Sequence, residues 1–260
     1  MWVFMSSIKK NNLFLLEEIV KKNFSSKYKD SVLGIFWSIL RPLLLMLLFT
    51  IIFSTIFKKN IENYEVYFLS GWCLFIFFTG AISVSMGSLK ANKNIILKTP
   101  APRHIFVLGS IISEFFNFII TILLLACVMI ITHASFYWST IAFSIIPIIS
   151  LTIMITGIGL MLSVACVYYT DIQHLWGVVT LVLMYGTCIF YPIEIIPEPY
   201  RHYVMLNPLF WVIDQFRCCV FYGNFPPMLD VINSLLLSVI ILILGIIIFK
   251  KYEKKISMKF

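Results

Sequence analysis

The chain alternates between long apolar stretches and short polar ones. Five stretches contain no Asp, Glu, Lys or Arg: residues 42–57, 66–89, 115–170, 172–193 and 231–249. A helix needs about 20 mostly apolar residues to cross the hydrocarbon core of a bilayer, and the third stretch is long enough for two crossings around a turn at 132–135. The pattern therefore predicts an all-α polytopic membrane protein with six transmembrane helices, at about 35–57, 66–89, 104–131, 140–167, 172–190 and 231–249.

The segment before the first span has a helical period. Between Leu13 and Tyr28, one face carries Glu17, Glu18, Lys21, Lys22 and Ser25. The opposite face is apolar, with Leu13, Leu16, Ile19, Val20, Phe24 and Tyr28. This pattern predicts an amphipathic helix that lies in the inner membrane interface, within an N-terminal cytoplasmic segment, 1–34. The alternative is a helix that only anchors the N-terminus.

A proline-rich segment, about 194–228, separates the fifth and sixth spans. Within it, residues 203–222 are apolar enough to enter the membrane but are interrupted by Asn207 and Pro208. Irregular backbone at membrane depth is tolerated where protein or a water-filled cavity satisfies its polar groups. We therefore expect re-entrant outer helices here, with a loop on the membrane surface as the alternative.

The basic residues indicate the orientation of the spans. If both termini are cytoplasmic, only Lys58, Lys59, Arg201 and Arg217 of the 20 basic residues lie outside. This is the positive-inside asymmetry of membrane proteins, so the net charge of +8 does not require a nucleic-acid partner. The prediction is a six-span domain, 35–250, followed by a basic cytoplasmic tail, 251–260. The N-terminus lacks the pattern of a removable signal peptide.

The motifs of common catalytic sites are missing from the sequence. No glycine precedes a lysine, so the chain lacks a phosphate-binding loop of the G-x-x-x-x-G-K-[ST] type. It contains no H-E-x-x-H, G-x-S-x-G or C-x-x-C pattern, and its four histidines lie on different predicted loops. We expect no catalytic residue, no metal site and no cofactor in this chain. Cys218 and Cys219 could form a disulfide on the outer side, or simply pack as small apolar residues.

Two further features concern the spans themselves. Glu114 is the acid well inside a predicted span, where it could accept a hydrogen bond between helices or line a path. The chain also has 24 Phe and 12 Tyr. Phe49, Phe53 and Phe57 form a stripe on the first span, and Tyr185 and Tyr191 lie toward the outer end of the fifth. Such a stripe suits the C–H faces of sugar rings, although helix packing would also use it.

Three stretches resemble a known family. The run from Lys27 to Leu43, KYKDSVLGIFWSILRPL, is similar to the start of the first span in ABC-2-type permeases that export bacterial polysaccharides. Tyr191-Pro192-Ile193 with Ile196-Pro197 resembles the end of that family's fifth span, and Asn207-Pro208-Leu209 with Arg217 resembles its outer re-entrant segment. The chain departs from the family at residues 22–27, where an Arg-Asp-Leu-Lys run is common, and before Asp171, where Arg is common.

The resemblance implies a function. It indicates the permease subunit of an ATP-driven ABC exporter that moves a lipid-linked polysaccharide across the bacterial cytoplasmic (inner) membrane. That polysaccharide would be the O-antigen of lipopolysaccharide biosynthesis, a capsule or a teichoic acid. The implied partners are a second copy of the chain, in a homodimer, and two copies of an ABC ATP-binding subunit, which binds the ATP and Mg. The chain would also contact the lipid-linked glycan and membrane lipids, but no nucleic acid.

The resemblance also implies three sets of site residues. The substrate channel would be lined by Trp37, Phe49, Phe53, Phe57, Tyr185 and Tyr191. Coupling to the ATPase would use the N-terminal helix and the loop at 90–104, through Lys21, Lys22, Lys90, Lys93, Lys98, Pro100 and Arg103. The outer gate would contain Asn207, Pro208, Asp214 and Arg217.

Two other functions remain open from the sequence. One is an ABC-2 exporter of small amphipathic drugs or lipids, which would have the same span count and ATPase dependence. The other is an ATPase-independent six-span channel or carrier. Co-purification with an ATP-binding subunit would reject the channel.

Overall fold

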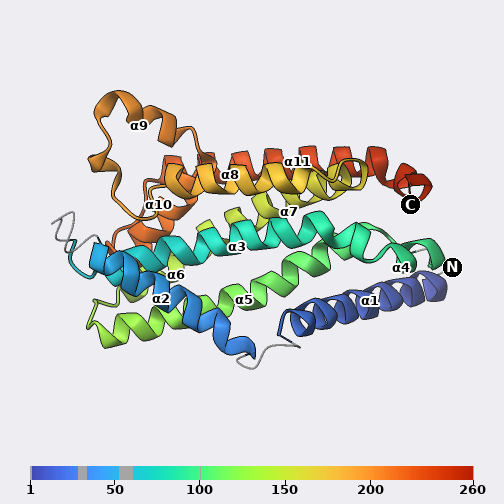
Figure 1. Cartoon of the computed structure of the whole chain (residues 1–260), viewed down its shortest axis with the longest axis horizontal. Helices are drawn as coiled ribbons and strands as arrows, with labels where there is room; N and C mark the ends of the chain where they lie inside the picture. The colour runs from blue at the N-terminus through green and yellow to red at the C-terminus, as the bar shows by residue number, and fades with distance from the viewer. Residues whose placement is uncertain (1, 29–33, 53–60, 100, 260) are drawn as a thin grey trace.

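A computed structural model of the chain describes residues 2–28, 34–52, 61–99 and 101–259. Every regular element in these ranges is a helix, and the long helices lie side by side in a bundle (Figure 1). Three predicted site residues, Phe53, Phe57 and Pro100, lie outside the described residues.

The order of the helices follows the order of the apolar stretches. The first half of the chain contains α1 (Trp2–Tyr28), η1 (Gly34–Phe36), α2 (Trp37–Ile51), α3 (Tyr64–Ala91), α4 (Lys93–Lys98), α5 (His104–Ile131) and α6 (Trp138–Phe143). The second half contains α7 (Ile145–Tyr168), α8 (Ile172–Gly186), η3 (Ile193–Ile195), α9 (Glu198–Met205), α10 (Pro208–Val220) and α11 (Met228–Lys259).

The apolar helices confirm a polytopic membrane protein. Five helical stretches of the described chain are long and apolar enough to cross a membrane: Gly34–Ile51, Tyr64–Ala91, His104–Ile131, Trp138–Tyr168 and Met228–Glu253. Helix α8, in the predicted fifth span, is apolar but has only 15 residues. At 1.5 Å per residue it is about 22 Å long, which is shorter than a hydrocarbon core of about 30 Å.

Several boundaries differ from those predicted. Helix α8 ends at Gly186 rather than at 190, because Cys188 adopts a left-handed backbone conformation with φ 51°, which commonly ends a helix. Helix α1 begins at Trp2, well before Leu13. Helix α11 continues through the predicted tail to Lys259. The predicted fourth span is divided into α6 and α7 at Ser144.

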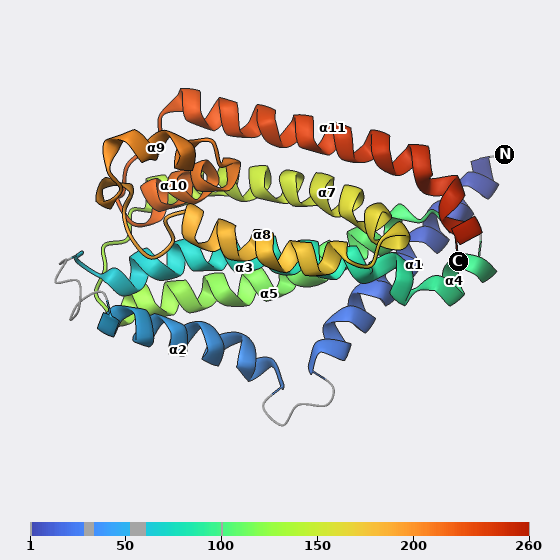
Figure 2. The ribbon, with the colours of Figure 1, turned by 45° about the horizontal axis from the view of Figure 1, so that its top comes forward.

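Helix α3 forms the centre of the bundle. It packs against α5 and α7 over much of its length, and against α2, α8 and α10 at other points. Most of its side chains are buried, including Phe68, Phe77 and Ile82. In Figure 2 α11 and α7 lie on one side of α3, and α5 and α2 lie on the other. The elements that surround α3 therefore expose their outer faces, which are apolar as expected for contact with lipid.

Small residues allow α7 and α11 to pack closely. A Cβ on Gly157 of α7 would lie 2.6 Å from the carbonyl oxygen of Ile241 of α11, so only glycine fits there. Further along the same contact, the hydroxyls of Ser150 and Ser238 lie 3.2 Å apart and share a hydrogen bond. Glycine and serine at a helix contact are typical of membrane bundles, where close packing replaces the hydrophobic effect.

Helix α1 lies along the N-terminal half of α5, at the end of the bundle where α11 also ends (Figure 1). Ile19 is buried against Gly109, whose absent side chain makes room for it. The predicted apolar face is only partly correct, because Leu13 is exposed. The packed face instead includes polar residues, since Asn23 donates to the Ser110 hydroxyl over 3.2 Å.

Candidate functional site

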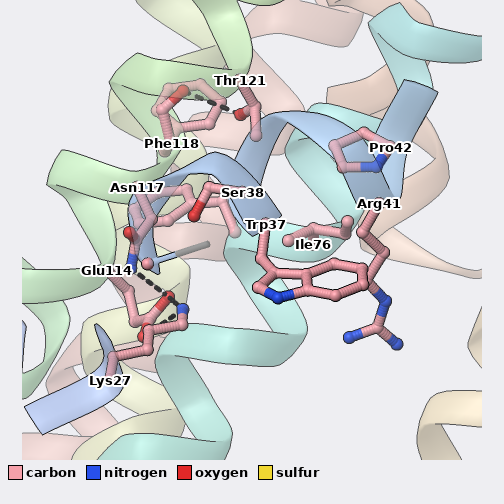
Figure 3. Close-up of a pocket in the computed structure, with 12 residues that line it drawn as sticks. Lys27, Trp37, Ser38, Arg41, Pro42, Ile76, Glu114, Asn117, Phe118 and Thr121 are labelled. Carbon is pink, nitrogen blue, oxygen red and sulfur yellow. Dashed lines mark hydrogen bonds and ion pairs between the residues drawn. The ribbon is translucent and has the colours of Figure 1, made fainter. Parts of the chain in front are cut away.

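A cavity of about 310 Å³ lies where α1 ends and α2 begins. We call it the inner polar cavity, and Figure 3 shows its lining. Its walls come from the end of α1, the first turns of α2, and the facing sides of α3 and α5. The polar or aromatic side chains among its lining are Lys27, Trp37, Ser38, Arg41, Phe77, Glu114, Asn117, Phe118 and Thr121.

An ion pair joins α1 to α5 in this cavity. The Lys27 ammonium lies 3.0 Å from both carboxylate oxygens of Glu114. The Asn117 amide also donates to Glu114, over 3.1 Å. The two side chains of the pair differ in exposure, since 45% of the Lys27 side chain but only 7% of the Glu114 side chain is accessible. Both roles expected for Glu114 are therefore compatible with the structure, because it accepts a hydrogen bond between helices and lines a cavity.

The predicted ATPase-coupling residues that the structure describes come from α1, α4 and the segments beside α4, toward the end of the bundle where the N-terminus of α1 lies (Figure 1). This end is called here the inner end, after the predicted orientation. Lys22 of α1 donates to the Asn92 side chain over 3.1 Å, which connects α1 to the segment between α3 and α5. Lys21 pairs with Glu17 at 3.0 Å on an exposed face. Lys90 donates to the Thr170 hydroxyl over 3.3 Å.

The rest of this segment is partly helical. Lys93 and Lys98 are exposed at the two ends of α4, and the backbone N–H of Arg103 donates to Glu253 of α11 over 3.3 Å. The inner end thus presents exposed lysines from both α1 and α4.

A second cavity, of about 470 Å³, lies near the other end of α2 and is called here the outer aromatic cavity. It is lined by Phe49, Tyr185, Phe190, Tyr191, Ile195, Ile196 and Pro197. The Phe49 and Phe190 rings are 4.3 Å apart between centroids. The Tyr191 hydroxyl donates to the carbonyl of Tyr185 over 2.7 Å. Tyr185 itself is 55% exposed, so its ring is available to a molecule outside the chain.

The predicted channel residues are therefore divided between two places. Phe49, Tyr185 and Tyr191 line the outer aromatic cavity, whereas Trp37 lines the inner polar cavity. Twelve residues of helix separate Trp37 from Phe49, or about 18 Å at 1.5 Å per residue. Helix α2 thus connects the two cavities.

The backbone after α8 is held by side chains from α3 and α10. Arg217, which is only 3% exposed, donates to the carbonyls of Cys188 and Ile189 over 2.8 and 2.7 Å. We call the segment 186–190 the carbonyl turn. The Tyr64 hydroxyl donates to the carbonyl of Phe190 over 2.9 Å, and the Asn207 amide lies 3.4 Å from the carbonyl of Gly186.

The environment of Arg217 contains an aromatic ring and a glycine as well. Its guanidinium lies 3.9 Å from the centroid of the Tyr67 ring and donates to the Tyr67 hydroxyl over 3.0 Å. A Cβ on Gly71 would lie 2.5 Å from Nη2 of Arg217, so this glycine makes room for the guanidinium. Burial is costly for a charge, and the acceptors of these hydrogen bonds together with the π contact offset that cost.

The other predicted gate residues, Asn207, Pro208 and Asp214, belong to α10 or to its N-cap, as Arg217 does. The Asn207 side chain caps α10 by accepting from the N–H of Leu209 over 3.0 Å, and Pro208 takes the first helical position, as is common. Burial raises the pKa of the Asp214 carboxyl above its ordinary value, and the nearby Arg217 guanidinium opposes this shift. Three of the four predicted gate residues, Asn207, Pro208 and Arg217, thus position α10 against the end of α8.

Comparison with known proteins identifies the family. The family model for the ABC-2 type transporter matches residues 15–221, which include both cavities and the carbonyl turn. The chain belongs to the ABC-2 type transporter family. The match begins within α1 and ends just after α10, so both helices are part of the ABC-2 domain.

Individual relatives of this ABC-2 chain cover almost its whole length. An O-antigen export system permease protein RfbA from Klebsiella pneumoniae is 27% identical over 94% of this chain and 93% of its own length. The polysialic acid transport protein KpsM from Escherichia coli is 21% identical over 92% of this chain and 93% of its own. A capsule polysaccharide export inner-membrane protein, CtrC, from Neisseria meningitidis serogroup A is 20% identical over 94% and 91%.

The sequence pattern missed the partners of the buried charges. Lys27 was grouped with the cytoplasmic lysines, although it lies eight residues after Ile19 and so shares the packed face of α1. Tyr64, Tyr67 and Phe190 were also missed, because no local pattern distinguishes them from the other aromatics.

The described residues contain no group of three or more His, Cys, Asp or Glu side chains that could hold a metal ion.

Proposed function

We propose that this chain is the permease subunit of an ABC exporter that moves a lipid-linked polysaccharide across the bacterial cytoplasmic membrane. The observation that carries the proposal is the similarity, over more than nine-tenths of both chains, to permeases of O-antigen and capsule polysaccharide export. The outer aromatic cavity supports it, because exposed aromatic rings offer weak, repeatable contacts to sugar rings. A polymer longer than the membrane is thick needs such contacts, since tight binding would stall it.

The exporter is proposed to work as a homodimer. Two helices that line the cavities, α2 and α8, leave much apolar surface uncovered. In α8 no residue is buried, and Leu175, Val178, Leu181 and Val182 are more than half exposed. In α2, Leu44 and Leu47 are more than half exposed as well. A second copy on these faces would place four helices around one path, with the outer aromatic cavities of both copies along it.

Energy is proposed to come from two copies of a separate ATP-binding subunit, which would hold the ATP and Mg. The docking surface would be the inner end of the bundle, where α1 and α4 lie together. Lys21, Lys93 and Lys98 are exposed there and could meet an acidic groove. Closure of the partner subunits would push on α4 and α1, and the Lys22 contact with Asn92 would make these two helices move together. Both termini would be cytoplasmic.

The outer end is proposed to act as a gate. Helices α9 and α10 would re-enter the membrane from the outer side, with Asn207, Pro208, Asp214 and Arg217 at the gate. This role is supported by the contacts of α10 with the carbonyl turn, because any movement of α10 would be transmitted to the end of α8.

A deletion strain tests the proposed function. Deleting the gene should cause the lipid-linked glycan to accumulate on the inner side of the cytoplasmic membrane, measured by glycan extraction from spheroplasts with and without permeabilisation. Complementation with Tyr185→Ala combined with Phe49→Ala should leave the dimer assembled but lower export at least severalfold, because both rings line the outer aromatic cavity. Trp138→Ala is the control, since this exposed aromatic lines neither cavity.

Two results would contradict the proposal. An absence of internal glycan in the deletion strain would reject polysaccharide as the substrate, and increased sensitivity to amphipathic drugs would then favour a small-molecule exporter. Normal export by the double variant would reject the assignment of the outer aromatic cavity to the path.

A further inference from the structure

Among the residues that the structure describes, the lining of the inner polar cavity holds more positive than negative charge. It contains two cations, Lys27 and Arg41, and one carboxylate, that of Glu114. Arg41 is exposed and makes no hydrogen bond or ion pair with any residue that the structure describes. In Figure 3 Lys27 and Arg41 lie on opposite sides of the Trp37 indole. The cavity therefore favours an anion.

Within the ion pair, Lys27 is the partner that can exchange its hydrogen bonds. The Glu114 carboxylate is buried and accepts from two side chains, Lys27 and Asn117. The ammonium of Lys27 has three donors, and its side chain is nearly half exposed. An incoming anion could therefore take up one or more of these donors without first exposing the buried carboxylate to water.

The start of α2 adds to the positive potential. Trp37 and Ser38, in the first turn of α2, both line the cavity, and no side chain caps this end of the helix. The N-terminal end of a helix carries a partial positive charge from its aligned peptide dipoles. This effect alone would not make a site, but it has the same sign as the two cations.

An apolar groove lies between the same two helices, α1 and α5, and Val20, Phe24, Ile112 and Phe116 are among the residues that line it. On α1, Phe24 of the groove precedes Lys27 of the cavity by one helical turn. On α5, Phe116 points to a different face from Glu114, because residues two apart on a helix do not face each other. An anion that carries a hydrocarbon chain could thus place its charge in the cavity and extend its chain along α1 toward the groove. The cavity volume of about 310 Å³ is at the small end for ligand sites, which suits a headgroup rather than a polysaccharide.

We propose that the inner polar cavity binds the phosphate headgroup of a lipid, with Glu114 as a built-in competitor that holds Lys27 in place until the headgroup arrives. Binding moves hydrogen bonds of Lys27 from Glu114 to phosphate oxygens, and the lining residue Arg41 supplies further positive charge. The contact between α1 and α5 is weakened as a result. The site thereby reports the presence of a lipid to α1. This inference rests on the proposed function in that the lipid is the one that carries the glycan.

Binding to the purified complex in nanodiscs tests this site without measuring export. The probe is radiolabelled geranylgeranyl diphosphate, compared with neutral geranylgeraniol and with inorganic diphosphate. Lys27→Met should weaken probe binding by about tenfold or more, as expected for loss of a charge-assisted contact. Glu114→Gln should strengthen it severalfold, because the competing charge is gone while an acceptor for Asn117 remains. Lys251→Met is the control and should leave probe binding unchanged, since this exposed lysine of α11 lines neither the cavity nor the groove.

The opposite signs of the two variants separate this proposal from a purely structural ion pair. A structural pair would make both variants lose binding together, through loss of folded protein, and this result would overturn the site. Lys27→Arg guards against misfolding, because it retains the charge and should keep at least part of the binding. Equal binding of geranylgeraniol would overturn anion recognition, and equal binding of inorganic diphosphate would overturn the role of the lipid chain.

The same measurement distinguishes this proposal from the proposed function. If the deletion strain accumulates no glycan but the probe binds with the predicted variant pattern, the lipid site stands and the polysaccharide assignment fails. If glycan accumulates but Lys27→Met and Glu114→Gln leave probe binding unchanged, the lipid site fails and the polysaccharide assignment stands.

Discussion

The inner polar cavity and the carbonyl turn hold their cations in opposite ways. In the inner polar cavity, Lys27 faces a side-chain carboxylate, that of Glu114, and is nearly half exposed. At the carbonyl turn, Arg217 is almost fully buried and faces backbone carbonyls, those of Cys188 and Ile189, together with the Tyr67 ring. Among the described residues no carboxylate lies within ion-pair distance of Arg217.

This difference separates an exchangeable contact from a fixed one. A carboxylate on a side chain can rotate, and another anion can replace it in the contact with Lys27. The carbonyls at Arg217 belong to the backbone of the carbonyl turn, so they cannot leave without moving the end of α8. A buried charge that loses such partners also has no water to replace them. We therefore interpret the inner cation as a ligand-responsive contact and the outer cation as an anchor for α8.

The largest expected effect comes from removing the outer anchor. Arg217→Met retains the apolar stem but removes three hydrogen bonds and leaves the carbonyls of Cys188 and Ile189 without these donors. Because each hydrogen bond to a charged group contributes about 1.5–3 kcal/mol and such losses are not additive, we expect the free energy of unfolding to fall by about 4 kcal/mol. Thermal unfolding of the detergent-solubilised protein measures this change.

Arg201→Met is the matched control. Arg201 also donates to two carbonyls, those of Ile196 and Glu194, but it does so where water can reach the bonds. Its loss should cost about 1 kcal/mol or less. Equal losses in the two variants would mean that Arg217 is not an anchor.

A smaller effect is expected from crowding the anchor instead of removing it. In Gly71→Ala the new methyl group would lie 2.5 Å from Nη2 of Arg217, so the guanidinium must move away from the carbonyls. Overpacking of this kind typically costs about 1–3 kcal/mol, and we expect about 2 kcal/mol from chemical unfolding of the purified protein. Gly87→Ala, on the same helix, is the control, because its nearest neighbour outside α3 is 4.0 Å away. Identical stabilities of the two variants would show that Arg217 tolerates displacement.

The fold was largely predictable from the sequence because span location depends on a local property. A charge-free apolar stretch has to be buried in protein or lipid wherever it occurs, so each of the predicted spans contains an apolar helix. The placement of the basic residues predicted that both termini share one side, and in Figure 1 the two ends of the chain lie at the same end of the bundle. The side of the membrane that this end faces stays a prediction.

The end of α8 could not be predicted because its cause is not local. Nothing between residues 186 and 190 is a proline, and Cys188 is not a residue that commonly adopts a positive φ. The turn is stabilised by Arg217, which lies 29 residues away in the sequence, and by Tyr64, which lies 126 residues before Phe190. The sequence could place Arg217 in the outer segment, but only the packing of α10 on α3 reveals what it contacts.

In the inner polar cavity the sequence singled out Glu114 but not its partner Lys27, again because their contact is not local. Glu114 was recognisable as a rare acid inside a span, but the partner of that acid depends on where α1 lies. The amphipathic pattern predicted α1 in the membrane interface and assigned Lys27 to neither face of the helix. In the structure α1 lies along α5, and this position brings Lys27 to Glu114. The pattern could not give this arrangement because the absence of a side chain at Gly109 is what lets Ile19 approach.

The smallest effect should come from the inner pair, and it should be asymmetric. Lys27→Met leaves a buried carboxylate with Asn117 as its remaining side-chain donor among the described residues, which should cost about 1 kcal/mol or somewhat more. Glu114→Gln keeps an acceptor for Asn117 and leaves Lys27 half exposed to water, so it should cost less, as exposed ion pairs generally do. The double variant should then be closer in stability to Glu114→Gln than to the sum of both losses. Thermal unfolding of the four proteins completes this cycle. A coupling of several kcal/mol would mean that the inner pair is a fixed anchor like Arg217, and the contrast between the two sites would be lost.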